Sequence, residues 1–174
     1  MPPTRVTKFL YFAYGSNMLS RRLRAPSRTP SARSICLGYV AGRRLCFDKV
    51  SADGSAKCDI ELTVNPGDRV WGVLFEIESC EKQKLDKAEG LERGYRKEFV
   101  EVVTSVGNRQ AVTYVATAKE PALRPYHWYK ALVIAGAIEH SLPRDYVEWL
   151  RTFNSIADPN AQRRAENEAL LFDG

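Results

Sequence analysis

The stretch that most constrains the fold is the segment of residues 11–18, Tyr-Phe-Ala-Tyr-Gly-Ser-Asn-Met, where an apolar run stops at a small polar turn. Residues 9–13 predict a short buried strand, because a continuous apolar run bounded by turn formers is typical of core strands. Gly15, Ser16 and Asn17 form the cluster of turn formers. We therefore expect a central strand that ends in a tight loop.

This loop is a candidate ligand site. Gly15 has no Cβ, so it can take positive φ and let another molecule approach the main chain closely. The N–H groups of Gly15, Ser16 and Asn17 could then point at a ligand oxygen, as successive N–H groups do in anion-binding turns. An ordinary turn that caps the next helix fits the same residues and stays open as an interpretation.

Periodicity and turn formers predict the remaining elements. Strands are expected over residues 9–14, 35–48 (one or two strands), 60–64, 70–77, 99–106 and 110–116, and helices over 18–23, 79–90, 129–139, 143–153 and 161–171. Gly107 and Asn108 are expected to form a hairpin turn. Tyr146, Trp149 and Leu150 are expected to face the core. About six strands followed by helices indicate the α+β class.

The length of 174 residues allows one domain with a substantial core, and a composition of 44% hydrophobic and 27% charged residues is ordinary for globular proteins. We expect a single domain over residues 1–174, with 1–8 as a loose tail and 155–174 as a C-terminal extension. No run of 18 apolar residues and no signal-peptide pattern is present, which predicts no membrane association and a cytoplasmic location.

Cysteine and histidine usage argues against a metal site, and none is expected. The cysteines are widely spaced without a Cys-x-x-Cys pair, and only two histidines are present. These residues are Cys36, Cys46, Cys58, Cys80, His127 and His140. We expect four free, mostly buried thiols, although a disulfide stays open if the compartment is oxidising. No phosphate-binding Gly-x-x-x-x-Gly-Lys loop occurs, so no nucleotide is expected.

The net charge of +5 comes from the N-terminal part of the chain, because residues 1–47 hold nine Lys or Arg and no Asp or Glu. Five of these cations lie close together at Arg21, Arg22, Arg24, Arg28 and Arg33. A solvated basic face, a nucleic-acid-binding arm and a field that attracts a small anion all fit the pattern. The segment has no interleaved aromatic residues and no recognisable nucleic-acid module, so we expect no nucleic-acid partner.

Two motifs resemble signatures of the γ-glutamylcyclotransferase family. The first is residues 11–17, and the second is Leu-Asp-Lys-Ala-Glu-Gly at 85–90, followed by Gly94 and Tyr95. They occur in the family's order, and with further similar segments at 66–73 and 129–143 the resemblance covers most of residues 9–150. The first motif reads Tyr-Gly-Ser-Asn. It differs from the Tyr-Gly-Thr-Leu of γ-glutamylamine cyclotransferases and the Tyr-Gly-Ser-Leu of the glutathione-specific branch, which favours an AIG2-like, Tyr-Gly-Ser-Asn branch.

The resemblance implies a small mixed β-barrel of about six strands flanked by helices, and an enzyme without a cofactor. In the implied reaction, the α-amine of a γ-glutamyl substrate attacks its own side-chain amide and releases 5-oxoproline and an amino acid or amine. Glu89 matches the family's acid/base glutamate. The residues that match substrate-contacting positions are Tyr11, Phe12, Ala13, Tyr14, Gly15, Ser16, Asn17 and Tyr129.

Physical chemistry supports Glu89 in this role, because the negative end of a helix dipole and an apolar pocket both raise the pKa of a carboxyl group. On composition alone, Glu89 would be a surface residue and Tyr129 a core aromatic. Ser16 is interpreted as a pocket donor. It is not a nucleophile, because no Gly-x-Ser-x-Gly elbow surrounds it and neither histidine has a recognisable triad partner.

Several points stay open at this level. Some family members separate the glycine and tyrosine that are adjacent here as Gly94 and Tyr95, which leaves the role of Tyr95 undecided. The amine that is released cannot be read from the sequence, and a homodimer is possible. The alternative function from another class is a non-catalytic ligand-binding or interaction protein with the same fold.

Overall fold

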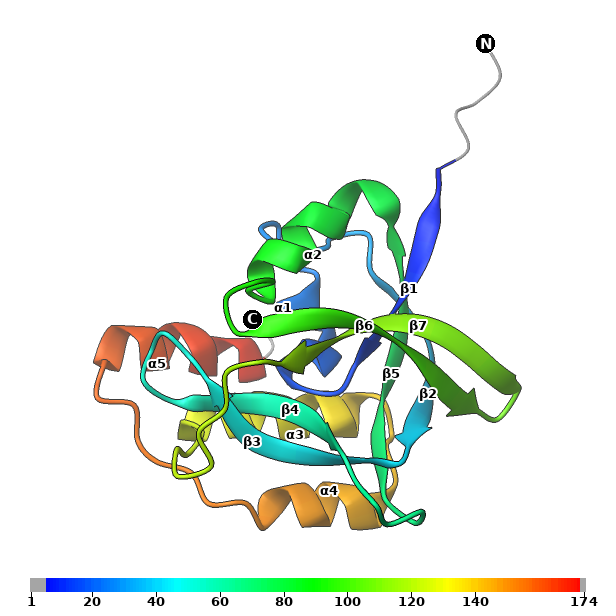
Figure 1. Cartoon of the computed structure of the whole chain (residues 1–174). Coiled ribbons are helices and arrows are strands. Elements are labelled where there is room, and N and C mark those ends of the chain that lie inside the picture. Colours follow the sequence, from blue (N-terminus) through cyan, green and yellow to red (C-terminus); the bar gives the residue numbers. More distant parts are fainter. Residues whose placement is uncertain (1–5, 173–174) are drawn as a thin grey trace.

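A closed five-stranded barrel is the centre of the computed structural model, which describes residues 6–172 (Figure 1). The strands follow the order β1 (Lys8–Ala13), β5 (Arg69–Glu78), β2 (Arg33–Ala41), β6 (Tyr95–Thr104) and β7 (Gly107–Ala116). Neighbouring strands are antiparallel except β1 and β7, whose parallel pairing closes the barrel at Tyr11 opposite Val112. This mixed barrel with its flanking helices confirms the predicted α+β fold.

The number of strands differs from the expected six. β3 (Arg43–Val50) and β4 (Ala56–Leu62) form a separate two-stranded antiparallel sheet, so seven strands are present within residues 6–172. The region 35–48 is two strands that meet at Gly42, where φ is +69°. Glycine adopts this left-handed conformation without the steric cost that a Cβ would bring.

The β6–β7 hairpin is confirmed, but its turn was placed two residues too late. Residues 105–106 form the turn, and Gly107 and Asn108 already pair with Thr104 and Val103. The Thr104 hydroxyl donates to the carbonyl oxygen of Gly107 at 2.6 Å and accepts from the N–H of Val106 at 3.2 Å. These side-chain bonds stabilise the turn before the glycine.

Five α-helices and three short 3₁₀ helices flank the strands in the described range 6–172. They are α1 (Ser20–Leu23), α2 (Lys82–Ala88), α3 (His127–Glu139), α4 (Arg144–Arg151) and α5 (Ala161–Glu168), with η1 (Ser16–Met18), η2 (Ser79–Glu81) and η3 (Ala169–Leu171). In the view of Figure 1, α2 lies above the barrel while α3 and α4 lie below it. None of these helices is long and apolar enough to cross a bilayer.

The core expectations hold with one exception. On α4, Tyr146 and Leu150 are buried as predicted, whereas Trp149 is 36% exposed and its ring packs edge-on against Phe153. Trp149 was therefore placed wrongly, because α4 has only one buried side and Trp149 lies at its edge. The four cysteines are free thiols, but the expectation that most are buried was wrong, because only Cys58 is buried while Cys80 is exposed.

The contact between α3 and η1 fixes the loop that follows β1. Gly136 of α3 is so close to this loop that an added Cβ would lie 2.5 Å from the Leu19 nitrogen and 2.6 Å from the Met18 Cβ. Met18 itself is fully buried. The backbones of α3 and the loop are thus packed directly against each other, which holds residues 15–18 in place.

We predict that Gly136→Ala lowers the free energy of unfolding by roughly 1–3 kcal/mol, the usual cost of overpacking. A decrease in the free energy of unfolding would identify overpacking as the cause, since alanine normally stabilises a helix interior by about 1 kcal/mol relative to glycine. Urea unfolding measures the difference. Gly67→Ala is the control, because a Cβ there meets nothing closer than 3.4 Å. A Gly136→Ala protein at least as stable as the wild type would contradict the packing argument.

Candidate active site

The loop after β1 brings main chain close to two buried side chains. Gly15 has a φ of −113°, which lies outside the left-handed region, so its backbone conformation does not explain why glycine is needed here. Instead, an added Cβ would lie 3.2 Å from the Cys58 Cβ and 3.3 Å from the Tyr129 hydroxyl. The N–H groups of Gly15, Ser16 and Asn17 form no hydrogen bond with residues 6–172 and remain available to a ligand.

Glu89 directly follows α2, as the sequence predicted. Its N–H still donates to the Leu85 carbonyl at 2.9 Å, and the next residue, Gly90, turns the chain away with a φ of +68°. Glycine is favoured after a helix for this left-handed turn. The helix end therefore presents the Glu89 side chain at a fixed position.

The Glu89 carboxylate is held by β1 and the loop that follows it. The Tyr11 hydroxyl donates to Oε1 of Glu89 at 3.0 Å, and the Asn17 Nδ2 donates to the same oxygen. Arg28 Nη1 in turn donates to the Asn17 Oδ1 at 3.2 Å. Since Arg28 can only donate, this bond assigns the carbonyl side of the Asn17 amide to the arginine and the NH₂ side to Glu89. Three predicted site residues thus meet at one oxygen.

These groups line a small cavity of about 30 Å³. Its lining consists of Tyr11, Tyr14, Gly15, Ser16, Asn17, Glu89, Tyr95, Tyr114 and Tyr129. It shares Ser16, Asn17, Glu89, Tyr95 and Tyr129 with a wider cavity of about 270 Å³. Glu89 therefore lies between a narrow recess and a space large enough for a small molecule.

The five tyrosines around the recess are fixed by hydrogen bonds. Tyr129 accepts from the Cys58 N–H at 3.1 Å, and Tyr95 donates to the Cys58 carbonyl at 2.6 Å. Tyr14 donates to the carbonyl of Tyr114. Burial raises the pKa of Tyr14, Tyr95 and Tyr129 well above the usual tyrosine range. They therefore act as neutral walls and positioning groups.

Phe12 and Ala13 were predicted as site residues, but neither lines the cavities. Both are fully buried, and the Ala13 carbonyl oxygen faces Gly72 of β5, where an added Cβ would lie 2.4 Å away. Successive residues of a strand point to opposite faces. With Tyr11 directed at Glu89, Phe12 points to the opposite face. Ala13 is on the same face as Tyr11 but is fully buried, so both residues belong to the core.

Sequence reasoning also missed residues of the site. Tyr114 on β7 reaches it because β7 pairs with β1, and its ring lies 5.9 Å from that of Tyr11. The wider cavity is lined by six cations, namely Arg22, Arg28, Lys49, Lys57, Lys87 and Arg93. Arg22 and Arg28 belong to the basic segment noted in the sequence, but nothing in the sequence placed them beside a glutamate.

Three of the cations are substantially desolvated. Burial lowers the pKa of Arg22 to about 10 and lowers the pKa values of Lys49 and Lys57. Arg22 Nη1 donates to Asn167 Oδ1 of α5 at 3.2 Å, while its buried Nε forms no hydrogen bond within residues 6–172. The Lys49 ammonium lies 4.6 Å from the centre of the Tyr95 ring. Such a lining favours a ligand that carries negative charge.

The pKa of Glu89 is raised above the usual glutamate range, and burial is the largest cause. The charge of Arg28 and the hydrogen bond from Tyr11 oppose this effect but do not cancel it. A carboxylate with a raised pKa exchanges protons closer to neutral pH, which suits a general acid/base. The arrangement can accept a proton from a bound amine and return it nearby.

Comparison with known proteins agrees with this geometry. A family model described as the AIG2-like family matches residues 69–150. The chain is 34% identical to the γ-glutamylcyclotransferase of Homo sapiens over 148 residues, which are 82% of this chain and 77% of the human protein. It is 32% identical to the γ-glutamylcyclotransferase of Bos taurus over 166 residues, or 93% and 85% of the two chains.

The fold is also similar to that of a known protein. A solved structure of a γ-glutamyl cyclotransferase matches with a TM-score of 0.85 and 31% identity, covering 95% of this chain and 98% of the other. The barrel places a buried glutamate beside a Gly-Ser-Asn loop, and relatives above 30% identity match most of the chain. These findings together define one class of protein. The chain belongs to the γ-glutamylcyclotransferase family.

We predict that Arg28→Gln moves the acid limb of the kcat/KM–pH profile to higher pH. Arg28 lowers the pKa of Glu89 through its charge, and its bond to Asn17 orients a donor to the carboxylate. Losing both effects raises the pKa of Glu89. When the pH is lowered, the proton-accepting carboxylate form of Glu89 is therefore lost at a higher pH than in the wild type. Arg33→Gln is the matched control, because Arg33 is exposed and pairs with Glu76. An unmoved acid limb would contradict the assignment.

Proposed function

We propose that this protein is a γ-glutamylcyclotransferase that converts a γ-glutamyl amino acid or amine into 5-oxoproline and the free amine, with Glu89 as general acid and base. The observation that carries the proposal is the Glu89 carboxylate, held by Tyr11 and Asn17 at the junction of the recess and the cationic cavity. The proposal extends to a cytoplasmic location, which fits four free thiols.

The reaction needs one proton shuttle. The substrate's α-ammonium must lose a proton before its nitrogen can attack the γ-amide carbon, and Glu89 is the carboxylate available to accept it. Closure of the five-membered ring forms the new C–N bond, and collapse of the tetrahedral intermediate breaks the old one. Glu89 then gives its proton to the departing nitrogen, takes the second excess proton from the new ring nitrogen and passes it to the released amine, so the products contain all atoms of the substrate and no water is consumed.

Charge that develops on the carbonyl oxygen needs donors. The unpaired N–H groups of Gly15, Ser16 and Asn17 supply them, because preorganised backbone donors stabilise an oxyanion without reorganisation. The γ-glutamyl group also carries an α-carboxylate. The six cations of the wider cavity attract such an anion, and this is the role we propose for the basic segment in place of nucleic-acid binding.

The rival function is a binding protein that keeps the pocket without catalysis. A panel of γ-glutamyl dipeptides and γ-glutamylamines, with 5-oxoproline as the readout, separates the two. We expect 5-oxoproline from at least one substrate. Binding of the panel without any product would favour the rival.

Glu89→Gln should reduce kcat about 10²- to 10⁴-fold, the usual effect of removing a positioned acid/base, with little change in KM. Glutamine keeps the size of the side chain and can still accept from Tyr11, so the fold should persist. Glu92→Gln is the control, because Glu92 is an exposed glutamate three residues further along. A Glu89→Gln enzyme with wild-type kcat would refute the mechanism.

Ser16→Ala tests a different point. Ser16 lines the recess, but the Ser16 hydroxyl forms no hydrogen bond to a histidine within residues 6–172. As a donor beside backbone N–H groups it is dispensable in part, so we expect substantial residual kcat, lowered by no more than about 10²-fold. Rapid-quench measurements on the wild type should detect no acyl-enzyme. An inactive Ser16→Ala variant together with a trapped acyl intermediate would identify Ser16 as a nucleophile.

A further inference from the structure

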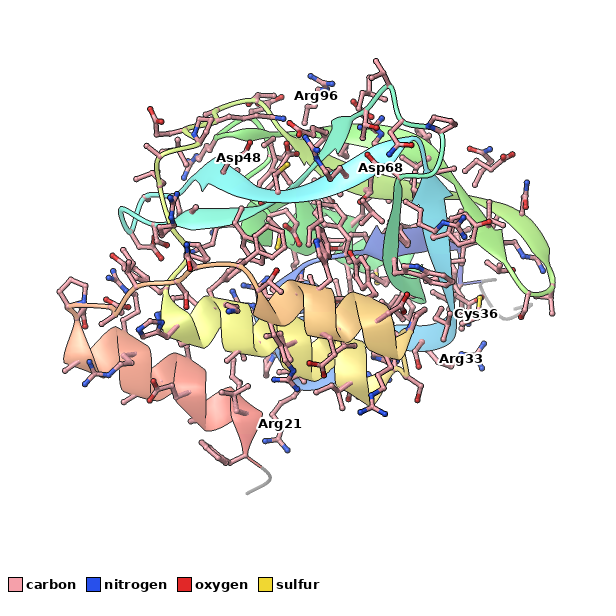
Figure 2. All side chains as sticks on the ribbon, turned by 90° about the horizontal axis from the view of Figure 1, so that it is seen from below. Arg21, Arg33, Cys36, Asp48, Asp68 and Arg96 are labelled. Carbon is pink, nitrogen blue, oxygen red and sulfur yellow. The ribbon has the colours of Figure 1, made fainter. Side chains whose placement is uncertain are left out.

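Another cavity, of about 600 Å³, lies away from Glu89. It is bordered by β3, by residues 121–125 and by the end of α4 with the residues that follow it. Three of its lining residues, Cys46, Asp48 and Glu61, each offer a metal-ligating atom. Figure 2 shows Asp48 on β3, at the sheet that faces α3 and α4.

The three side chains are brought together by the pairing of β3 with β4. Cys46 and Asp48 are two residues apart on β3, where the register with β4 shifts between Phe47 and Lys49, and Glu61 lies on β4 opposite Arg44. One sulfur and two carboxylate oxygens lie within 4.8 Å of one another. Ligands of a tetrahedral Zn²⁺ are about 3.5 Å apart, so side-chain rotation of about 1 Å completes the geometry.

The burial of Asp48 is an independent observation that favours a bound cation at this site. It is only 8% exposed, and its buried Oδ1 accepts no hydrogen bond from residues 6–172. A buried carboxylate without donors is costly unless it is paired or coordinates a metal. Burial accordingly raises the pKa of Asp48.

The neighbouring cations are already engaged with other acids. Arg44 pairs with Oε1 of Glu61 at 2.8 Å, and Lys119 pairs with Asp59. Arg124 also lines the cavity, but its Nη1 donates to three backbone carbonyls of residues 121–123. Arg44 and Lys119 are thus each paired with another carboxylate, and Asp48 forms no ion pair within residues 6–172.

We propose that Cys46, Asp48 and Glu61 form a binding site for a divalent transition metal of the zinc class. A thiolate with two carboxylates suits a borderline ion such as Zn²⁺ better than Mg²⁺ or Ca²⁺, which prefer oxygen ligands only. On binding, the Cys46 thiol releases its proton to solvent and the sulfur bonds to the metal. Asp48 and Glu61 each contribute one oxygen, and the cavity leaves the fourth position to water.

The site is separate from catalysis. Asp48 lines the β3 cavity, whereas the next residue, Lys49, lines the cavity beside Glu89. Loss of metal binding and loss of cyclotransferase activity are therefore distinguishable, and the proposal does not depend on the reaction assigned to Glu89.

Isothermal titration of the reduced, metal-free protein with Zn²⁺ tests the proposal. We expect one ion per chain, and binding weakened at least tenfold by Cys46→Ser. Cys36→Ser is the matched control: Cys36 is also a half-buried strand thiol, but Figure 2 shows it on β2, at the opposite side of the view from Asp48. No Zn²⁺ binding by the wild type, or equal binding by the wild type and Cys46→Ser, would overturn the proposal.

A second variant guards against misfolding of the cysteine mutant. Asp48→Asn removes an unpaired buried charge, so it should fold at least as stably as the wild type while binding Zn²⁺ at least tenfold more weakly. Zn²⁺ should raise the Tm of the wild type and of Cys36→Ser, but not of Asp48→Asn. Co²⁺ should give a thiolate charge-transfer band that Cys46→Ser lacks. A Zn²⁺-induced Tm shift that persists in Asp48→Asn, or no such band in the wild type, would also overturn the site.

Discussion

A carboxylate removed from water must find donors, and the donors to Glu89 come from β1 and the loop after it, more than seventy residues earlier in the chain. The strands make this meeting possible. β5 runs antiparallel to β1 and ends beside Lys8. From there η2 and α2 return for about 16 Å, at about 2.0 and 1.5 Å per residue, which is most of the roughly 20 Å length of β1 at about 3.3 Å per residue. Glu89 thus arrives level with the loop after Ala13.

Much of this fold could be predicted from local patterns. The apolar run of β1, the helix after Ser79 and the hairpin of β6 and β7 all follow from period and turn formers. The barrel itself could not, because its closure depends on one parallel pairing of Tyr11 with Val112 across the length of the chain. The hairpin turn lies before Gly107 and not at Gly107-Asn108, because the Thr104 hydroxyl forms hydrogen bonds there. A rule based on the Gly-Asn pair alone does not include these bonds.

The site was predictable where its residues are contiguous and not where they come together in space. The two motifs located Glu89 and Asn17, and a strict application of strand alternation would have excluded Phe12. Tyr114 and Lys49 enter through strand pairing alone, so no spacing rule could assign them. Cys46 and Glu61 also come together only through the pairing of β3 with β4. No sequence motif such as Cys-x-x-Cys therefore marks them.

The bond between Arg22 and Asn167 gives the end of the chain a part in the cavity. The matched family segment stops at residue 150, yet an arginine that borders the substrate space is held from α5, beyond that limit. A substitution in α5 can therefore change the shape and charge of the cavity beside Glu89, while the glutamate and its loop stay unchanged.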